Sequence, residues 1–116
     1  MYKRIIFILL LTGYCFYLNG QAVLSCINCN SLTALSTATF KVTNGPVTNN
    51  NYVANYTWKL VKQPYSWIWY SNYSTRIVPF PFSGTYKINV IVHYVRRSTG
   101  SVVSLQTTNT LTITVQ

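Results

Sequence analysis

The sequence predicts an all-β protein, an antiparallel two-sheet sandwich preceded by a hydrophobic N-terminal signal segment. Two observations predict the sandwich. From residue 37 to the end, apolar and polar residues alternate with a period of two, which is the pattern of half-buried strands. Turn-forming residues separate these stretches, and patterns typical of helices are nearly absent. The third observation, a short apolar run after two basic residues, predicts the signal segment.

Residues 1–22 have the pattern of a secretory signal peptide. Lys3 and Arg4 precede an apolar run that begins at Ile5, and small residues near Ala22 would suit a signal peptidase. The run is interrupted, and it is shorter than the roughly 20 residues that span a bilayer comfortably. We therefore expect cleavage and a secreted or cell-surface protein. Membrane attachment would require that the segment is retained.

Residues 23–36 are expected to form an N-terminal arm that carries a Cys-x-x-Cys motif. Cys26 and Cys29 permit three interpretations: a small disulfide, a redox site or half of a zinc site. The flanking residues lack the helix-opening pattern of a redox motif, and His93 is the one further good zinc ligand of the mature chain. We favour the local disulfide, with no metal and no cofactor.

Residues 37–116 are expected to form the sandwich. Each alternating stretch has an apolar face and a mostly polar one, as in sheets with one face packed and one in water, and the stretches lie at residues 38–43, 56–61, 85–95 and 110–115. Tyr56, Trp58 and Leu60 share one apolar face, and Tyr86 lies on another. The two largest of these side chains that point inward, Trp58 and Tyr86, are therefore predicted to anchor the core.

Part of this pattern resembles a known family. Residues 83–92 read SGTYKINVIV and are similar to a strand of immunoglobulin-like domains of the PKD type, found in bacterial surface and secreted proteins. Residues 56–60 resemble their third strand, and residues 110–115 resemble the end of their last strand. The resemblance covers residues 37–116 and implies a Greek-key sandwich in which the Tyr86 hydroxyl binds the backbone. The Gly-Asp-Gly signature of PKD domains is missing, so the resemblance indicates the immunoglobulin-like class.

Composition excludes most enzyme chemistry. The 116 residues include nine Lys and Arg but no Asp or Glu, where average usage predicts roughly 14 carboxylates. General acid–base pairs, carboxylate-oriented triads and hard-cation sites all depend on those side chains, so we expect a non-catalytic protein. Its basic surface would attract anionic polymers, although export argues against nucleic acid. The basic residues expected at the surface are Lys41, Lys59, Lys87, Arg96 and Arg97.

Residues 65–73 carry five aromatic side chains in nine positions. Trp67 and Trp69 have strand parity and are expected to share one face. Two interpretations remain open: the rings fill the core, or they form an exposed strip that stacks on sugars or packs against a protein. The candidate binding strip comprises Tyr65, Trp67, Trp69, Tyr70, Tyr73 and Arg76.

These observations favour a secreted or cell-surface structural, adhesion or assembly subunit that works through protein–protein contact. Exposed edge strands would offer a means of binding a partner or a second copy by strand addition. The alternatives are a carbohydrate-binding module that uses the aromatic strip, and a basic surface that binds polyanions.

Overall fold

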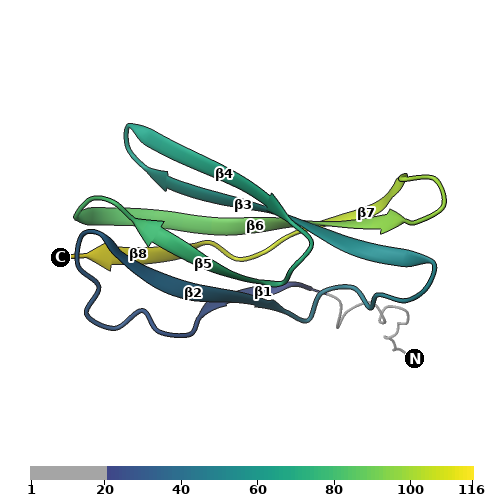
Figure 1. The fold of residues 1–116 in the computed structure, drawn as a ribbon, viewed down its shortest axis with the longest axis horizontal. Coiled ribbons are helices and arrows are strands. Elements are labelled where there is room, and N and C mark those ends of the chain that lie inside the picture. The colour runs from purple at the N-terminus through teal and green to yellow at the C-terminus, as the bar shows by residue number, and fades with distance from the viewer. Residues whose placement is uncertain (1–20) are drawn as a thin grey trace, which may run out of the picture.

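The computed structural model describes residues 21–116, and these residues form an all-β structure with two antiparallel sheets (Figure 1). The three-stranded sheet has the order β1-β2-β5 and consists of β1 (Val23–Cys26), β2 (Ser36–Thr43) and β5 (Thr75–Phe80). The prediction of an all-β chain with two antiparallel sheets is confirmed. Nearly all of the predicted signal segment, residues 1–20, lies outside the described residues.

The five-stranded sheet has the order β4-β3-β6-β7, and β8 also pairs with β6. It consists of β3 (Tyr52–Lys62), β4 (Tyr65–Ser71), β6 (Gly84–Arg96), β7 (Val102–Thr107) and β8 (Leu111–Val115). Strands β3 and β4 form a hairpin whose turn contains the cis peptide bond Gln63–Pro64. The alternation of residues along each strand places one face of this sheet against the three-stranded sheet.

The core lies between the two sheets. Trp58 and Tyr86 are both 0% exposed. Phe80 of the three-stranded sheet meets Tyr86 of the five-stranded sheet edge-on, with ring centroids 5.0 Å apart. The indole N–H of Trp58 donates to Ser71 Oγ at 3.3 Å, so this buried polar group keeps a partner. Tyr56 has the parity of Trp58 but is only half-buried, and it packs against the core.

The N-terminal arm differs from its prediction, because part of it belongs to the sandwich. Strand β1 pairs with β2 from Val23↔Thr43 to Cys26↔Phe40, and the side chains of Ala22, Leu24 and Leu32 are buried. Strand β1 has only four residues, of which only Leu24 is fully buried, and this pattern is too short to indicate a strand in the sequence. Cys26 and Cys29 form a disulfide, with Cα atoms 5.8 Å apart, immediately after β1.

The last strand position of the five-stranded sheet is divided between β7 and β8. At the interruption, Thr108 is buried, and its Oγ1 accepts a hydrogen bond from the Val90 amide at 2.9 Å. The side chain of Asn109 pairs with the backbone of Leu24, accepting from its N–H at 2.8 Å and donating to its carbonyl at 3.1 Å. The interruption thereby fastens strand β1 to the edge of the other sheet.

The Tyr86 hydroxyl is bonded to the backbone of Phe82 four residues earlier. It accepts from the Phe82 N–H at 2.9 Å and donates to the Phe82 carbonyl at 2.8 Å. One buried phenol therefore satisfies two backbone groups of the turn that leads into β6.

We expect Tyr86→Phe to lower the free energy of unfolding by about 1–3 kcal/mol, because two backbone groups lose their partner while the ring stays in place. Urea unfolding followed by circular dichroism measures the change. Tyr70→Phe is the matched control. Because Tyr70 is 77% exposed, this variant should have the same free energy of unfolding as the wild type. Equal stabilities for wild type and Tyr86→Phe would contradict a stabilising role for this contact.

Candidate functional site

Sheet edges are where a sandwich can accept another chain, because an edge strand presents unpaired N–H and C=O groups. Two sheets have four edges, and three of them are protected over part or all of their length here. Strand β1 is four residues long and ends at the disulfide. Strand β5 contains Arg76 and Pro79, and Pro79 lacks an N–H. The β7–β8 edge is interrupted at Asn109, and residues 106–109 bind the segment at residues 21–24, although the first residues of β7 stay exposed.

Strand β4 is the fourth edge, and it lacks these protections. It runs for seven residues, Tyr65–Ser71, with the sequence YSWIWYS, which contains no proline, glycine or charged residue. Its one hydrogen-bonded neighbour among residues 21–116 is β3, registered from Tyr56↔Ser71 to Lys62↔Tyr65. In Figure 1 it forms the upper margin of the molecule. Its backbone is therefore available for pairing along one whole side.

The two faces of β4 separate the residues of the predicted binding strip. Trp67 and Trp69 point toward the core layer and are half-buried. Ile68 and Tyr70 point to the outer face and are 51% and 77% exposed. Tyr73 is also exposed, but it lies beyond the end of the strand. The shared face of Trp67 and Trp69 thus follows the predicted parity, and the residues do not form one continuous strip.

On the inner side, aromatic rings and one guanidinium form a row that we call the aromatic ledge. Tyr65 stacks on Phe82 at a centroid distance of 5.2 Å and lies 6.0 Å from Trp67. Further along β4, the Arg76 guanidinium carbon lies 4.9 Å from the centroid of the Trp69 ring. The ledge comprises Tyr65, Trp67, Trp69, Phe82 and Arg76. It connects the core to the unpaired edge of β4.

Arg76 has an unusual environment. Its Nε is buried and has no hydrogen-bond partner among residues 21–116. A cation stacked on tryptophan gains about 0.5–2 kcal/mol, but the stacking does not satisfy the N–H groups. Since the chain contains no Asp or Glu, no side chain of this protein can neutralise the guanidinium. The position of Arg76 in the candidate strip was predicted, whereas its stacking on Trp69 was not.

The basic residues named in the sequence analysis are distributed over several regions. Lys41 is exposed on the outer face of the three-stranded sheet, and Lys59 and Lys87 line one depression on the five-stranded sheet. Arg96 stacks on Tyr52 at 5.2 Å, near the β6–β7 hairpin. Its neighbour Arg97 donates from Nε to the Asn49 carbonyl at 3.3 Å. The structure does not gather these cations into one patch.

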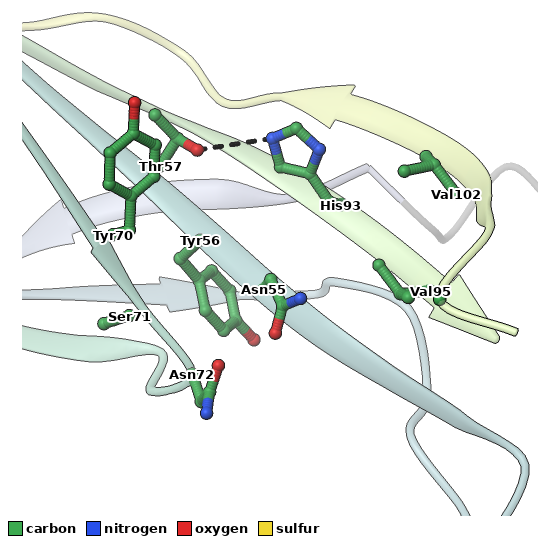
Figure 2. Close-up of a pocket in the computed structure, with 10 residues that line it drawn as sticks. Asn55, Tyr56, Thr57, Tyr70, Ser71, Asn72, His93, Val95 and Val102 are labelled. Carbon is green, nitrogen blue, oxygen red and sulfur yellow. Dashed lines mark hydrogen bonds between the residues drawn. The ribbon is translucent and has the colours of Figure 1, made fainter. Parts of the chain in front are cut away.

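A separate pocket of about 630 Å³ lies at the outer face, where β3, β4 and β6 approach the β6–β7 hairpin (Figure 2). None of its lining side chains is Lys or Arg. Thr57 Oγ1 and His93 Nε2 are 3.3 Å apart within it, so the lone histidine is half-buried and bonded. The lining residues are Asn55, Tyr56, Thr57, Tyr70, Ser71, Asn72, His93, Val95, Gly100 and Val102.

No family model matches the chain, and neither a curated protein nor a solved structure matches it. Residues 21–116 contain no cluster of three or more His, Cys, Asp or Glu side chains that could hold a metal ion. The same residues include no helix with the length and apolar character needed to cross a membrane. The candidate site is accordingly described by its own geometry: an unprotected edge strand beside the aromatic ledge.

Burial raises the pKa of Tyr56 above its ordinary value of 10.0. The folded protein therefore retains this proton at a pH where the unfolded chain has released it. Its contribution to stability is complete below the unfolded pKa and is lost as the pH rises above about 10. We expect Tyr56→Phe to reduce the alkaline fall in the free energy of unfolding, measured by urea unfolding between about pH 8 and pH 11.

Tyr73→Phe is the control for this experiment, because Tyr73 is exposed on a turn. Its alkaline profile should match that of the wild type. If the Tyr56→Phe profile also matches the wild type, the partial burial of Tyr56 does not contribute to the pH dependence.

Proposed function

We propose that this chain is a secreted or cell-surface, non-catalytic structural or assembly subunit that binds a protein partner by strand addition to β4. One observation carries the proposal: of the four sheet edges formed by the described residues, β4 is the longest continuous one that lacks proline, charge and a tether to another segment. Natural β proteins commonly shield such edges with charge, proline or a covering segment. An edge left unshielded is therefore explained by a partner that covers it.

We further propose that the domain has the immunoglobulin-like Greek-key topology. The chain places β1, β2 and β5 in one sheet and the remaining strands in the other, so it crosses between the sheets after β2, after β4 and after β5. The fully buried Trp58 on the third strand and the Tyr86 hydroxyl bonded to the Phe82 backbone also support the proposal. Both are hallmarks of that fold class.

An added strand would extend the five-stranded sheet through β4. Main-chain hydrogen bonds would supply affinity, and alternate side chains would supply selectivity. Every second side chain of the added strand would lie beside Ile68 and Tyr70 on the outer face. The remaining side chains would lie beside Trp67 and Trp69, where the half-buried rings offer more apolar area to cover.

Export is proposed on two independent grounds. Residues 1–22 have the pattern of a signal peptide. The Cys26–Cys29 disulfide also suits an oxidising compartment, where such bonds persist. Both are consistent with a subunit that meets its partner outside the cell.

Peptides selected from a phage-displayed random library should protect the amides of β4, Tyr65–Ser71, when hydrogen exchange is followed by mass spectrometry. Ile68→Lys should weaken their binding about fivefold, because it removes one apolar cross-strand pair. Ile77→Lys on β5 is the matched control, since Ile77 is 64% exposed on a protected edge and the substitution adds the same charge. Protection confined to other strands, or equal effects of the two substitutions, would refute strand addition at β4.

The outer-face pocket supports a second candidate function, the binding of neutral sugars. An exposed ring, Tyr70, stands beside amide and hydroxyl groups from Asn55, Asn72 and Thr57, and no Lys or Arg lines the pocket. Flat rings pack on the apolar faces of sugars, while amides and hydroxyls exchange hydrogen bonds with sugar hydroxyls. Figure 2 shows these side chains around a shared space.

On an array of neutral glycans, Tyr70→Ala should lower any specific binding at least about fivefold by removing the stacking ring. Tyr73→Ala removes a similarly exposed ring that does not line the pocket, and it should leave binding unchanged. The absence of glycan binding by the wild type would eliminate this second candidate and would leave the β4 proposal intact.

A further inference from the structure

We propose that the partner segment received by β4 comes from a different protein and carries a carboxylate side chain that binds Arg76. The inference rests on the proposed strand addition and specifies the chemistry of the occupant. It is drawn from the position of Arg76, from the charge of the whole chain and from the geometry of an added strand.

Arg76 is held in place but is incompletely bonded. Its guanidinium lies over Trp69 at 4.9 Å, and its Nε is buried without a partner. Among residues 21–116 no acceptor bonds this Nε, although Arg76 as a whole is only half-buried. A planar guanidinium fixed by stacking presents its remaining N–H groups as a fork that fits a carboxylate. The binding geometry is thus prepared before a ligand arrives.

Charge argues against a second copy as the occupant. The chain has nine Lys and Arg and no Asp or Glu, so another copy would bring no side-chain carboxylate to Arg76. Two copies paired through β4 would also place two strongly positive molecules in contact, which is unfavourable. An acidic partner removes both difficulties.

The geometry places a carboxylate within reach. An added strand would lie about 4.7–4.9 Å from β4, and every second side chain would point toward the core layer. The Trp69 side chain also points toward the core layer, and the Arg76 guanidinium stacks on its ring. An inward Asp or Glu near the level of Trp69 would therefore meet the guanidinium at the open margin between β4 and β5.

Two synthetic peptides long enough to span β4 test the inference. Both alternate Thr and Val, and they differ only in a central residue, Glu in one and Gln in the other. The Glu peptide should bind about tenfold more tightly at low salt, as expected for a hydrogen bond to a charged group. Its advantage should shrink as salt is added. Arg76→Gln should abolish this advantage, while both peptides still protect the β4 amides from hydrogen exchange.

Lys41→Gln is the matched control, because it removes one exposed charge from the same sheet, away from the ledge. The Glu preference should survive it. A preference that persists in Arg76→Gln, or that disappears equally in Lys41→Gln, would overturn the carboxylate inference while β4 protection upholds strand addition. If neither peptide protects β4, both proposals fail. If the protein protects its own β4 as concentration rises, the occupant is a second copy and the inference is wrong.

Discussion

Burial of two apolar sheet faces against each other is the interaction on which the rest of this structure depends. No ion pair between side chains can contribute, because the chain has no Asp or Glu. Stability must therefore come from side chains such as Trp58 and Tyr86, which are removed from water, and from backbone hydrogen bonds that complete the sheets. The same constraint determines the surface: its cations repel one another, and none is neutralised by a side chain of the same molecule.

That core also explains why the candidate site lies where it does. Strand β4 is the edge strand of a sheet with four strand positions that faces a sheet of only three, so its inward residues extend past full coverage. Trp67 and Trp69 are consequently half-buried, with one part of each ring on the core and another at the margin. Arg76 reaches this margin from the opposite sheet. The site thus combines a fixed inner side with an unpaired backbone, which suits recognition of an extended chain.

Local pattern predicted the fold class but not the neighbours of each strand. Alternation identified β2, β3, β6 and β8, and it assigned Trp58 and Tyr86 inward because large rings on an apolar face are rarely ambiguous. Strand β7 escaped detection because almost all of its residues are exposed, and β5 because Arg76 interrupts its inward face and Pro79 lies on its outer face. Which strand forms an edge, and which ring Arg76 meets, depend on strand order. Strand order is set by contacts between distant residues, which a periodic pattern does not record.

The two hydrogen bonds between the Asn109 side chain and the Leu24 backbone affect when the sandwich can be completed during synthesis. These residues are 85 positions apart, and they close the free side of the first strand. Further backbone bonds join Leu32 and Ala34 to Gln116. A chain emerging from the ribosome can pair β1, β2 and β5 once Phe80 has been made, but the contacts that close the free side of β1 must wait for Asn109 and Gln116, and contacts of such long range form slowly. This delay would leave the closing contacts of the sandwich unmade during synthesis, which suits the proposed export, because a polypeptide is threaded through an export channel before it has folded.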